Sequence, residues 1–219
     1  MSPASGKRPS PLRSAAALGL VALAATALLA GVHQLTEERI AEQERRAILR
    51  QLGELVPPAR YDNELHEDRI RFSDEEYFPG GQQVTAYRAR RDGQPVAVIL
   101  RFAAPDGYSG PIQLLAGIDY DGSLAGVRVT AHKETPGLGD AIEIEKGDWV
   151  RSFRGKSLGS PPTERWAVKR DGGVFDQFTG ATITPRAIVE AVQRALGYYE
   201  SHREELFAPP DGNREGAGP

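Results

Sequence analysis

The chain has 219 residues, of which 40% are hydrophobic and 26% are charged, values typical of a folded soluble domain with short appendages. Its formal net charge of -3, without a basic cluster interleaved with aromatics, gives no support for a nucleic-acid partner. The absence of cysteine excludes disulfides, thiolate-bound metal centres, CxxCH haem attachment and a cysteine nucleophile, so any redox role requires a cofactor not held by sulfur.

An uncharged run near the N-terminus predicts a membrane anchor at residues 14–32, SAAALGLVALAATALLAGV. As a helix it would span roughly 28 Å, close to the thickness of the bilayer's hydrocarbon core. Basic residues precede it and acidic residues follow it, which predicts a cytoplasmic segment at 1–13 and a main domain outside the cytoplasm. The alternative is a signal peptide cleaved after Ala25-Thr26-Ala27. The run continues beyond that point, which favours an uncleaved anchor.

A stalk helix is predicted at residues 33–58. Thr36 can cap its start, and Pro57 and Pro58 end the pattern. Apolar residues at three- and four-residue spacing, Ile48, Leu52 and Leu55, form one stripe that we expect to pack on the following domain. A helix that binds a partner is the alternative interpretation.

The main domain is predicted to span residues 59–206 and to be followed by a disordered tail at 207–219. Strand patterns occur in VTAYRARR, PVAVILRF, IQLLAGIDYDGSLAGVRVTAHKE and ERWAVKR, with a hairpin expected at Asp121-Gly122. A final helix is predicted from Pro185 to about Leu206, with one apolar face. The predicted class is α+β, an antiparallel sheet with packed helices.

The stretch FDQFTGATITPRAIVEAV, residues 175–192, places three threonines before this helix. Pro185 suits the first helical position and Thr184 suits the cap. Thr182 then lies near unpaired backbone N–H groups and a helix dipole that favour an attached or bound phosphate. The small residues Gly180 and Ala181 would let a large ligand approach the backbone. A tight turn with capping threonines is the alternative.

Two further stretches carry glycines beside strands. AHKETPGLGD, residues 131–140, combines a Pro-Gly-Leu-Gly turn with His132 and Glu134, which would share one face of a strand. The other histidines have no spacing suited to a zinc site, so we expect no metal. DGYSGPIQLLAGID, residues 106–119, has glycines at two bends before a strand. A plain loop explains either stretch equally well when it is taken alone.

Together these stretches resemble a known family. Asp176 and the run from Thr179 to Thr182 match the flavinylation motif of FMN-binding domains, an Asp three residues before Ser/Thr-Gly-Ala-Thr. HKETPGLG and GYSGPI are similar to two other stretches of that domain. With the anchor and YDNEL at residues 61–65, the chain resembles the G subunits of Rnf (Rsx) electron-transport complexes up to about Leu206.

The resemblance implies FMN attached to Thr182 through a phosphoester bond made by a separate flavin transferase, which would recognise Asp176. It also implies an electron carrier without a substrate reaction of its own, in a complex that couples ferredoxin and NAD oxidoreduction to ion movement. The implied partners are the other subunits, the flavin transferase and the membrane. Further implied cofactor-binding residues are Thr179, Gly180, Ala181, Thr184, His132, Glu134, Thr135, Gly137, Leu138 and Gly139.

Two other functions compete with this interpretation. The C subunit of the sodium-pumping NADH:quinone oxidoreductase shares the flavin domain, although YDNEL and the compact domain favour the Rnf type. A non-redox extracytoplasmic scaffold, in which TGATIT is only a capped turn, belongs to a different class.

Overall fold

The computed structural model describes residues 15, 18–23, 25–26, 28–29, 43, 45–46 and 48–208. Residues 1–47 and 48–219 form separate units. No helix in the described part of the chain is long and apolar enough to cross a membrane. Much of the expected anchor and stalk, the segment 1–13 and the tail from residue 209 lie outside the described residues. The fold below concerns residues 48–208.

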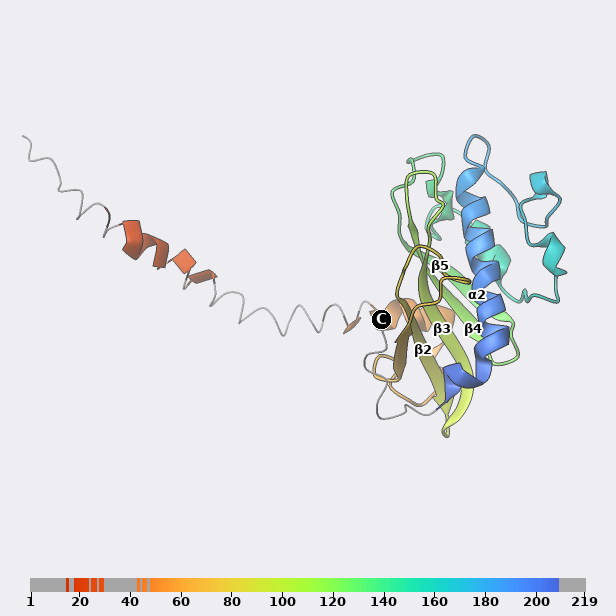
Figure 1. Ribbon diagram of the computed structural model, residues 1–219, viewed down its shortest axis with the longest axis horizontal. Coiled ribbons are helices and arrows are strands. Elements are labelled where there is room, and N and C mark those ends of the chain that lie inside the picture. The colour runs from red at the N-terminus through yellow and green to blue at the C-terminus, as the bar shows by residue number, and fades with distance from the viewer. Residues whose placement is uncertain are drawn as a thin grey trace, which may run out of the picture. The chain divides into compact units, whose positions relative to one another are not determined.

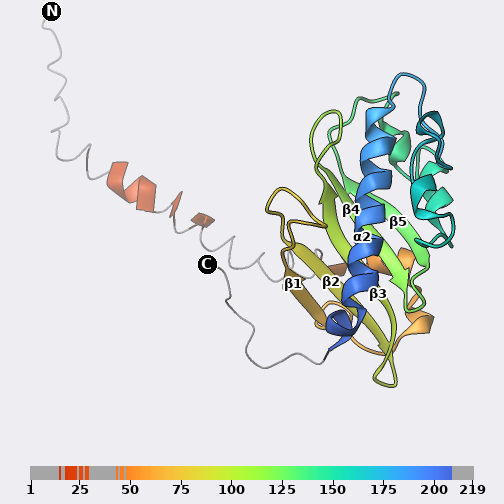
Figure 2. The same cartoon turned by 45° about the vertical axis from the view of Figure 1, so that its right-hand side comes forward.

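Five antiparallel strands form one sheet in chain order (Figures 1 and 2). β2 coincides with VTAYRARR, and the hairpin between β4 and β5 turns at Asp121-Gly122, where Gly122 has φ 89°. Both predictions are confirmed. The short edge strand β1 was not predicted. The strands are β1 (Arg69–Phe72), β2 (Val84–Arg91), β3 (Gln94–Ala104), β4 (Ile112–Asp119) and β5 (Leu124–Ala131).

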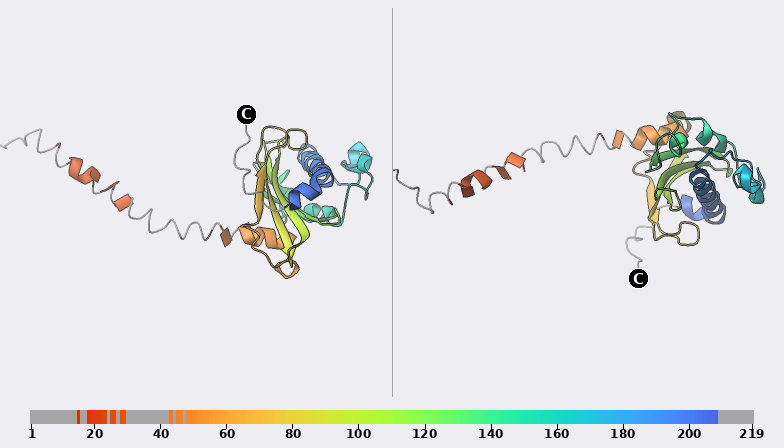
Figure 3. Two further views of the ribbon diagram at one scale, coloured as in Figure 1. Left: turned by 60° about the horizontal axis from the view of Figure 1, so that its bottom comes forward. Right: turned by 90° about the horizontal axis from the view of Figure 1, so that it is seen from above.

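Helices cover both faces of the sheet, as seen end-on in Figure 3. The long helix α2 (Ile183–Phe207) lies on one face and buries its predicted stripe, formed by Ile188, Val192, Ala195, Leu196 and Tyr199. Helical residues 48–55 lie on the other face, where Leu52 and Leu55 pack with Ile99 and Leu115. The α+β class and the packing of the stalk stripe on the domain are confirmed.

The prediction of a strand at ERWAVKR, residues 164–170, is wrong. The segment forms one isolated parallel bridge, from Val168 to Phe175, and turn bonds such as Trp166 N–H to the Thr163 carbonyl, and it does not join the sheet. Trp166 and Val168 are buried nonetheless, Trp166 with its ring 5.2 Å from that of Phe175. Short 3-10 turns occur at η1 (Pro58–Arg60), η2 (Asp140–Ile142), η3 (Trp149–Phe153), η4 (Thr163–Arg165) and η5 (Lys169–Asp171).

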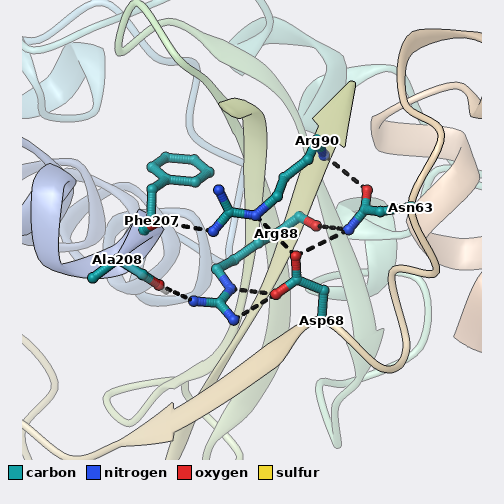
Figure 4. A network of polar contacts seen from close by, with 6 residues as sticks. All are labelled: Asn63, Asp68, Arg88, Arg90, Phe207 and Ala208. Atoms are coloured by element: carbon teal, nitrogen blue, oxygen red, sulfur yellow. Dashed lines mark hydrogen bonds and ion pairs between the residues drawn. The ribbon is translucent and has the colours of Figure 1, made fainter. Parts of the chain in front are cut away.

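A polar network holds the C-terminal end of α2 to the sheet (Figure 4). Arg88 Nη1 donates to the Ala208 carbonyl at 2.7 Å and Arg90 Nη2 to the Phe207 carbonyl at 2.8 Å. Cations are favoured at this end by the helix dipole. Asp68 binds both guanidinium groups, and Asn63, from YDNEL, donates to Asp68 and to the Arg88 carbonyl. With this end fixed, the N-terminus of α2 is positioned at the opposite end of the sheet.

Candidate functional site at the start of helix α2

One buried carboxylate joins the three glycine-bearing stretches. Glu134 Oε1 accepts the Ser109 N–H at 3.0 Å, and Oε2 accepts the Thr184 hydroxyl at 2.5 Å. Glu134 is 5% exposed and Thr184 is fully buried. In Figure 1 the loops after β3 and β5 lie at the same end of the sheet as the start of α2. The sequence segments 107–110, 132–139 and 179–184 therefore form one site.

Close packing at this junction requires glycine at two positions. A Cβ on Gly139 would lie 2.9 Å from Glu134 Oε2 and 3.2 Å from Thr184 Oγ1. A Cβ on Gly107 would lie 2.3 Å from the Gly110 carbonyl oxygen. All three distances are shorter than ordinary van der Waals contacts, so a larger residue would push the loops away from the carboxylate.

The predicted Pro-Gly turn is confirmed and places Leu138 at the surface. Leu138 N–H donates to the Thr135 carbonyl at 3.1 Å, with Pro136 and Gly137 between them and Gly137 at φ 78°. The Leu138 side chain is 47% exposed, and its Cδ2 lies 3.8 Å from the position of a Cβ on Gly180. The two glycine turns are therefore neighbours.

Thr184 does not cap the helix, contrary to the sequence prediction. α2 begins at Ile183, so Thr184 lies inside the first turn, and its hydroxyl is turned to the carboxylate of Glu134. A charge-assisted bond to a buried carboxylate is stronger than a bond to a backbone N–H. Thr182 occupies the cap position instead. Its half-buried hydroxyl caps no helix N–H and has no hydrogen-bond partner among the described residues.

The start of α2 has the electrostatic character that the sequence predicted for an anion. The first bond within the helix runs from Arg186 N–H to the Thr182 carbonyl at 3.3 Å, and Pro185 carries no N–H. Free donors in this turn therefore belong to Ile183 and Thr184, and no acidic residue lies in the first turn. The Thr182 hydroxyl lies at the positive end of the helix dipole.

Each of the three stretches presents one exposed apolar side chain. Tyr108, Leu138 and Ile183 are 68%, 47% and 46% exposed, and in residues 48–208 only Tyr120 is a further large hydrophobic of this kind. Apolar groups gathered beside convergent polar groups are typical of a ligand site or an interface. Tyr108, Ser109 and Ile183 were not predicted as site residues, although each lies within one of the three stretches.

His132 supports the backbone of Glu134 and does not lie on a strand, because β5 ends at Ala131. Its Nδ1 accepts the Glu134 N–H at 3.0 Å, so Nε2 carries the proton and donates to Glu143 Oε1 at 2.9 Å. Lys146 Nζ binds Glu143 at 2.7 Å and Asp140 at 2.9 Å and lowers the pKa of both carboxyls. No group of three metal-ligating side chains occurs within the described ranges.

Asp176 lies apart from the buried carboxylate. Its side chain is exposed, with Oδ1 2.5 Å from Lys169 Nζ, and its carbonyl accepts the Trp149 indole N–H at 2.7 Å. The Trp149 ring packs against Phe178, whose carbonyl closes the next turn by accepting the Ala181 N–H at 3.1 Å. Asp176, Thr179 and Gly180 thus lie along the surface leading to Thr182, without contacting Glu134.

Comparison with known proteins defines the class of this domain. A family model described as an FMN-binding domain matches residues 107–197, which begin at Gly107 and include all three converging stretches. A second model, described as the RnfG N-terminal region, matches residues 1–55. The chain therefore contains an α+β FMN-binding domain.

Whole-chain relatives identify the family. The chain is 54% identical to the G subunit of the ion-translocating oxidoreductase complex of Pseudomonas aeruginosa (strain UCBPP-PA14), over 93% of this chain and 95% of the relative. It is 46% identical to the corresponding G subunit of Shewanella loihica, over 91% and 94%, and 44% identical to that of Aliivibrio fischeri (strain MJ11), over 90% and 94%. The chain belongs to the family of G subunits of ion-translocating oxidoreductase complexes.

Proposed function

We propose that this chain is the electron-carrier subunit of a membrane-bound, ion-translocating oxidoreductase complex, with FMN attached to Thr182 through a phosphoester. The observation that carries the proposal is the convergence of three stretches on Glu134 beside a Thr182 hydroxyl without a partner among the described residues. A scaffold with only a capped turn would not account for this, because the threonine in the cap position caps nothing.

The residues present fit a flavin phosphate. The phosphate on Thr182 would lie at the N–H-rich, positive start of α2, and Gly180 leaves room beside it. The exposed apolar side chains of Tyr108, Leu138 and Ile183 suit the flat ring of the cofactor. FMN supplies the electron-transfer chemistry, and a covalent tether prevents its loss by dilution.

The chain's own residues would position the cofactor. Glu134 and Thr184 hold the start of α2 against the two loops, and His132 fixes the backbone of Glu134. Further binding residues proposed from the motifs are Thr135, Gly137, Gly139, Thr179, Gly180 and Ala181. Asp176 is exposed beside this turn, which is consistent with recognition by a flavin transferase during maturation.

We propose the following topology for the chain, in the order of its residues. Residues 14–32 anchor the chain in the bacterial inner membrane with residues 1–13 in the cytoplasm, and 33–58 form the stalk. Residues 59–206 form the periplasmic FMN-binding domain, and 207–219 form a tail. Electrons would pass between this subunit and its partners in a ferredoxin- and NAD-linked complex, without a substrate reaction in this chain.

The test is co-expression with a flavin transferase, followed by in-gel flavin fluorescence of the denatured chain. We expect a fluorescent band for the wild type and for Thr163→Ala, and none for Thr182→Ala. Tryptic cleavage after Arg170 and Arg186 yields the peptide 171–186, which mass spectrometry should find with the flavin on Thr182. Fluorescence retained by Thr182→Ala would refute the attachment site, and a dark wild-type band would refute the covalent carrier.

A further inference from the structure

A groove crosses the sheet face that carries helical residues 48–55, on the part that these residues leave open. Its volume is about 420 Å³. It contains two cations and several amides but no carboxylate. The lining residues are Arg71, Gln82, Gln83, Thr85, Arg101, Phe102, Ala103 and Gln113.

Two arginines flank the groove on neighbouring strands. Arg71 on β1 faces Thr85 on β2, which faces Arg101 on β3, so all three project from one face. The strand spacing puts the two arginine Cα atoms about 10 Å apart. Both side chains are exposed, and neither forms an ion pair with any residue that the structure describes. Arg128, further along the same row, is bound by Glu54 at 3.1 Å.

The amides around these arginines differ in what they bind. The Gln82 side chain already has partners within the protein. It accepts the Ala103 N–H at 2.6 Å and donates to the Ala103 carbonyl at 3.0 Å. Gln83 and Gln113 make no side-chain hydrogen bond with the described residues. They offer donors and acceptors to whatever lies in the groove, as a peptide backbone requires.

The groove opens onto the free edge of β1. Arg88 N–H donates to the Asp68 carbonyl at 2.9 Å, and antiparallel pairing alternates from there. The backbone groups of Ile70 therefore face β2, and those of Arg71 face outward. No described residue pairs with this outer edge. An incoming strand can bond to the Arg71 backbone and place an acidic side chain against its guanidinium.

We propose that this groove and edge dock an acidic, extended segment of another subunit of the complex. Unpaired arginines and the absence of carboxylates select for acidic side chains, and free amides with an unpaired strand edge select for a peptide backbone. A lipid headgroup or free phosphate would use the arginines but leave the strand edge unused. The proposal is independent of flavin attachment at Thr182.

The first test uses the full chain, tagged and co-expressed with its complex and its flavin transferase. Arg71→Glu/Arg101→Glu should lower the other subunits recovered per tagged chain at least five-fold, with in-gel flavin fluorescence unchanged. The matched control is Arg50→Glu/Arg165→Glu, which makes the same charge change at two exposed arginines outside the groove. Equal recovery for both double variants would overturn the proposal.

A second test identifies the chemistry of the occupant. Fluorescein-labelled Glu-Thr repeat peptide should bind the purified full chain in detergent, and Arg71→Glu/Arg101→Glu should weaken that binding at least ten-fold. Methylation of the backbone nitrogen of every glutamate removes the N–H groups that would face β1 and should weaken it similarly. Equal binding of the N-methylated peptide, or arginine-dependent binding of phosphatidylglycerol vesicles or inorganic phosphate without peptide binding, would contradict the proposal.

Discussion

The Thr184 hydroxyl donates to Glu134 Oε2 at 2.5 Å and so joins two residues that lie 50 positions apart in the chain. The other oxygen of the same carboxylate accepts the Ser109 N–H, so one buried group holds two loops and the start of α2 together. The proposed flavin attachment site, Thr182, lies one residue before this helix. The position of Thr182 therefore depends on a contact that Thr182 itself does not make.

Removing the Thr184 hydroxyl should destabilise the domain. Thr184→Val keeps the shape of the side chain but leaves Glu134 Oε2 buried without its donor, at a cost of about 1–3 kcal/mol. We expect a lower urea midpoint for Thr184→Val, and slower flavin attachment by the transferase at Thr182. Thr184→Ser retains the donor and serves as the control. A urea midpoint for Thr184→Val equal to that of the wild type would show that the bond contributes nothing.

Gly139 should tolerate no side chain. Its φ of -87° is open to any residue, so Gly139→Ala tests packing alone: the new Cβ would lie 2.9 Å from Glu134 Cβ. Overpacking of this kind costs about 1–3 kcal/mol. Urea unfolding should show that loss for Gly139→Ala and little change for Gly159→Ala, where nothing lies within 4 Å. Matching midpoints for the two variants would mean that the loop moves aside freely.

Elements whose sequence pattern is local could be predicted from the sequence. VTAYRARR has strand-forming residue types and forms β2, Asp121-Gly122 turns the hairpin between β4 and β5, and the apolar stripe of α2 is buried as its spacing predicted. ERWAVKR carries the same kind of strand signal, but Trp166 and Val168 are buried outside the sheet, Trp166 against other aromatic rings. Strand propensity reports a preference for burial, and it does not say whether a partner strand exists.

The candidate site was likewise only partly predictable from the sequence. The resemblance assigned Glu134, Leu138 and Thr182 to one cofactor-binding site, and their segments lie together in the structure, but the helix cap was assigned to Thr184 from sequence order alone. Glu134 reaches Thr184 across 50 positions, and no local rule describes a carboxylate competing for a capping hydroxyl. The Arg88–Asp68 pair was missed for the same reason, since β1 is too short to give a strand pattern.

Lys146 should make the stability of the site loop depend on pH. It lowers the pKa of Asp140 and of Glu143, so their stabilising contribution is present above the ordinary carboxyl range and is lost as pH falls through the lowered values. Lys146→Met should therefore be less stable than wild type at pH 7. The difference in free energy of unfolding between the wild type and Lys146→Met should narrow between about pH 5 and pH 3.

Urea unfolding at several pH values checks this, with Lys133→Met as the control because Lys133 has no ion pair among the described residues. High salt should also narrow the difference at pH 7, since Lys146 is half exposed and its ion pairs are screened. A Lys146→Met difference that stays constant from pH 7 to pH 3 would show that the carboxylates act independently of Lys146.

Arg88 should be among the costliest arginines to replace. Its side chain is 4% exposed, binds Asp68 through Nε at 2.6 Å and Nη2 at 2.5 Å, and donates to the Ala208 carbonyl at the end of α2. Arg88→Met removes one partner of a largely buried ion pair, which costs about 3–5 kcal/mol. Arg69→Met, at an exposed position two residues before Arg71 on β1, should change stability by no more than about 0.5 kcal/mol.

Urea unfolding of both variants measures the difference directly, and hydrogen exchange locates it. In Arg88→Met the amides in the last turns of α2 should exchange faster than the same amides in the wild type, with little change near Ile188, because the helix loses its attachment at one end. If Arg88→Met and Arg69→Met unfold at the same urea concentration, the network does not hold the helix. The N-terminus of α2, where Thr182 lies, would then be positioned by the Glu134–Thr184 bond and the apolar packing of the helix alone.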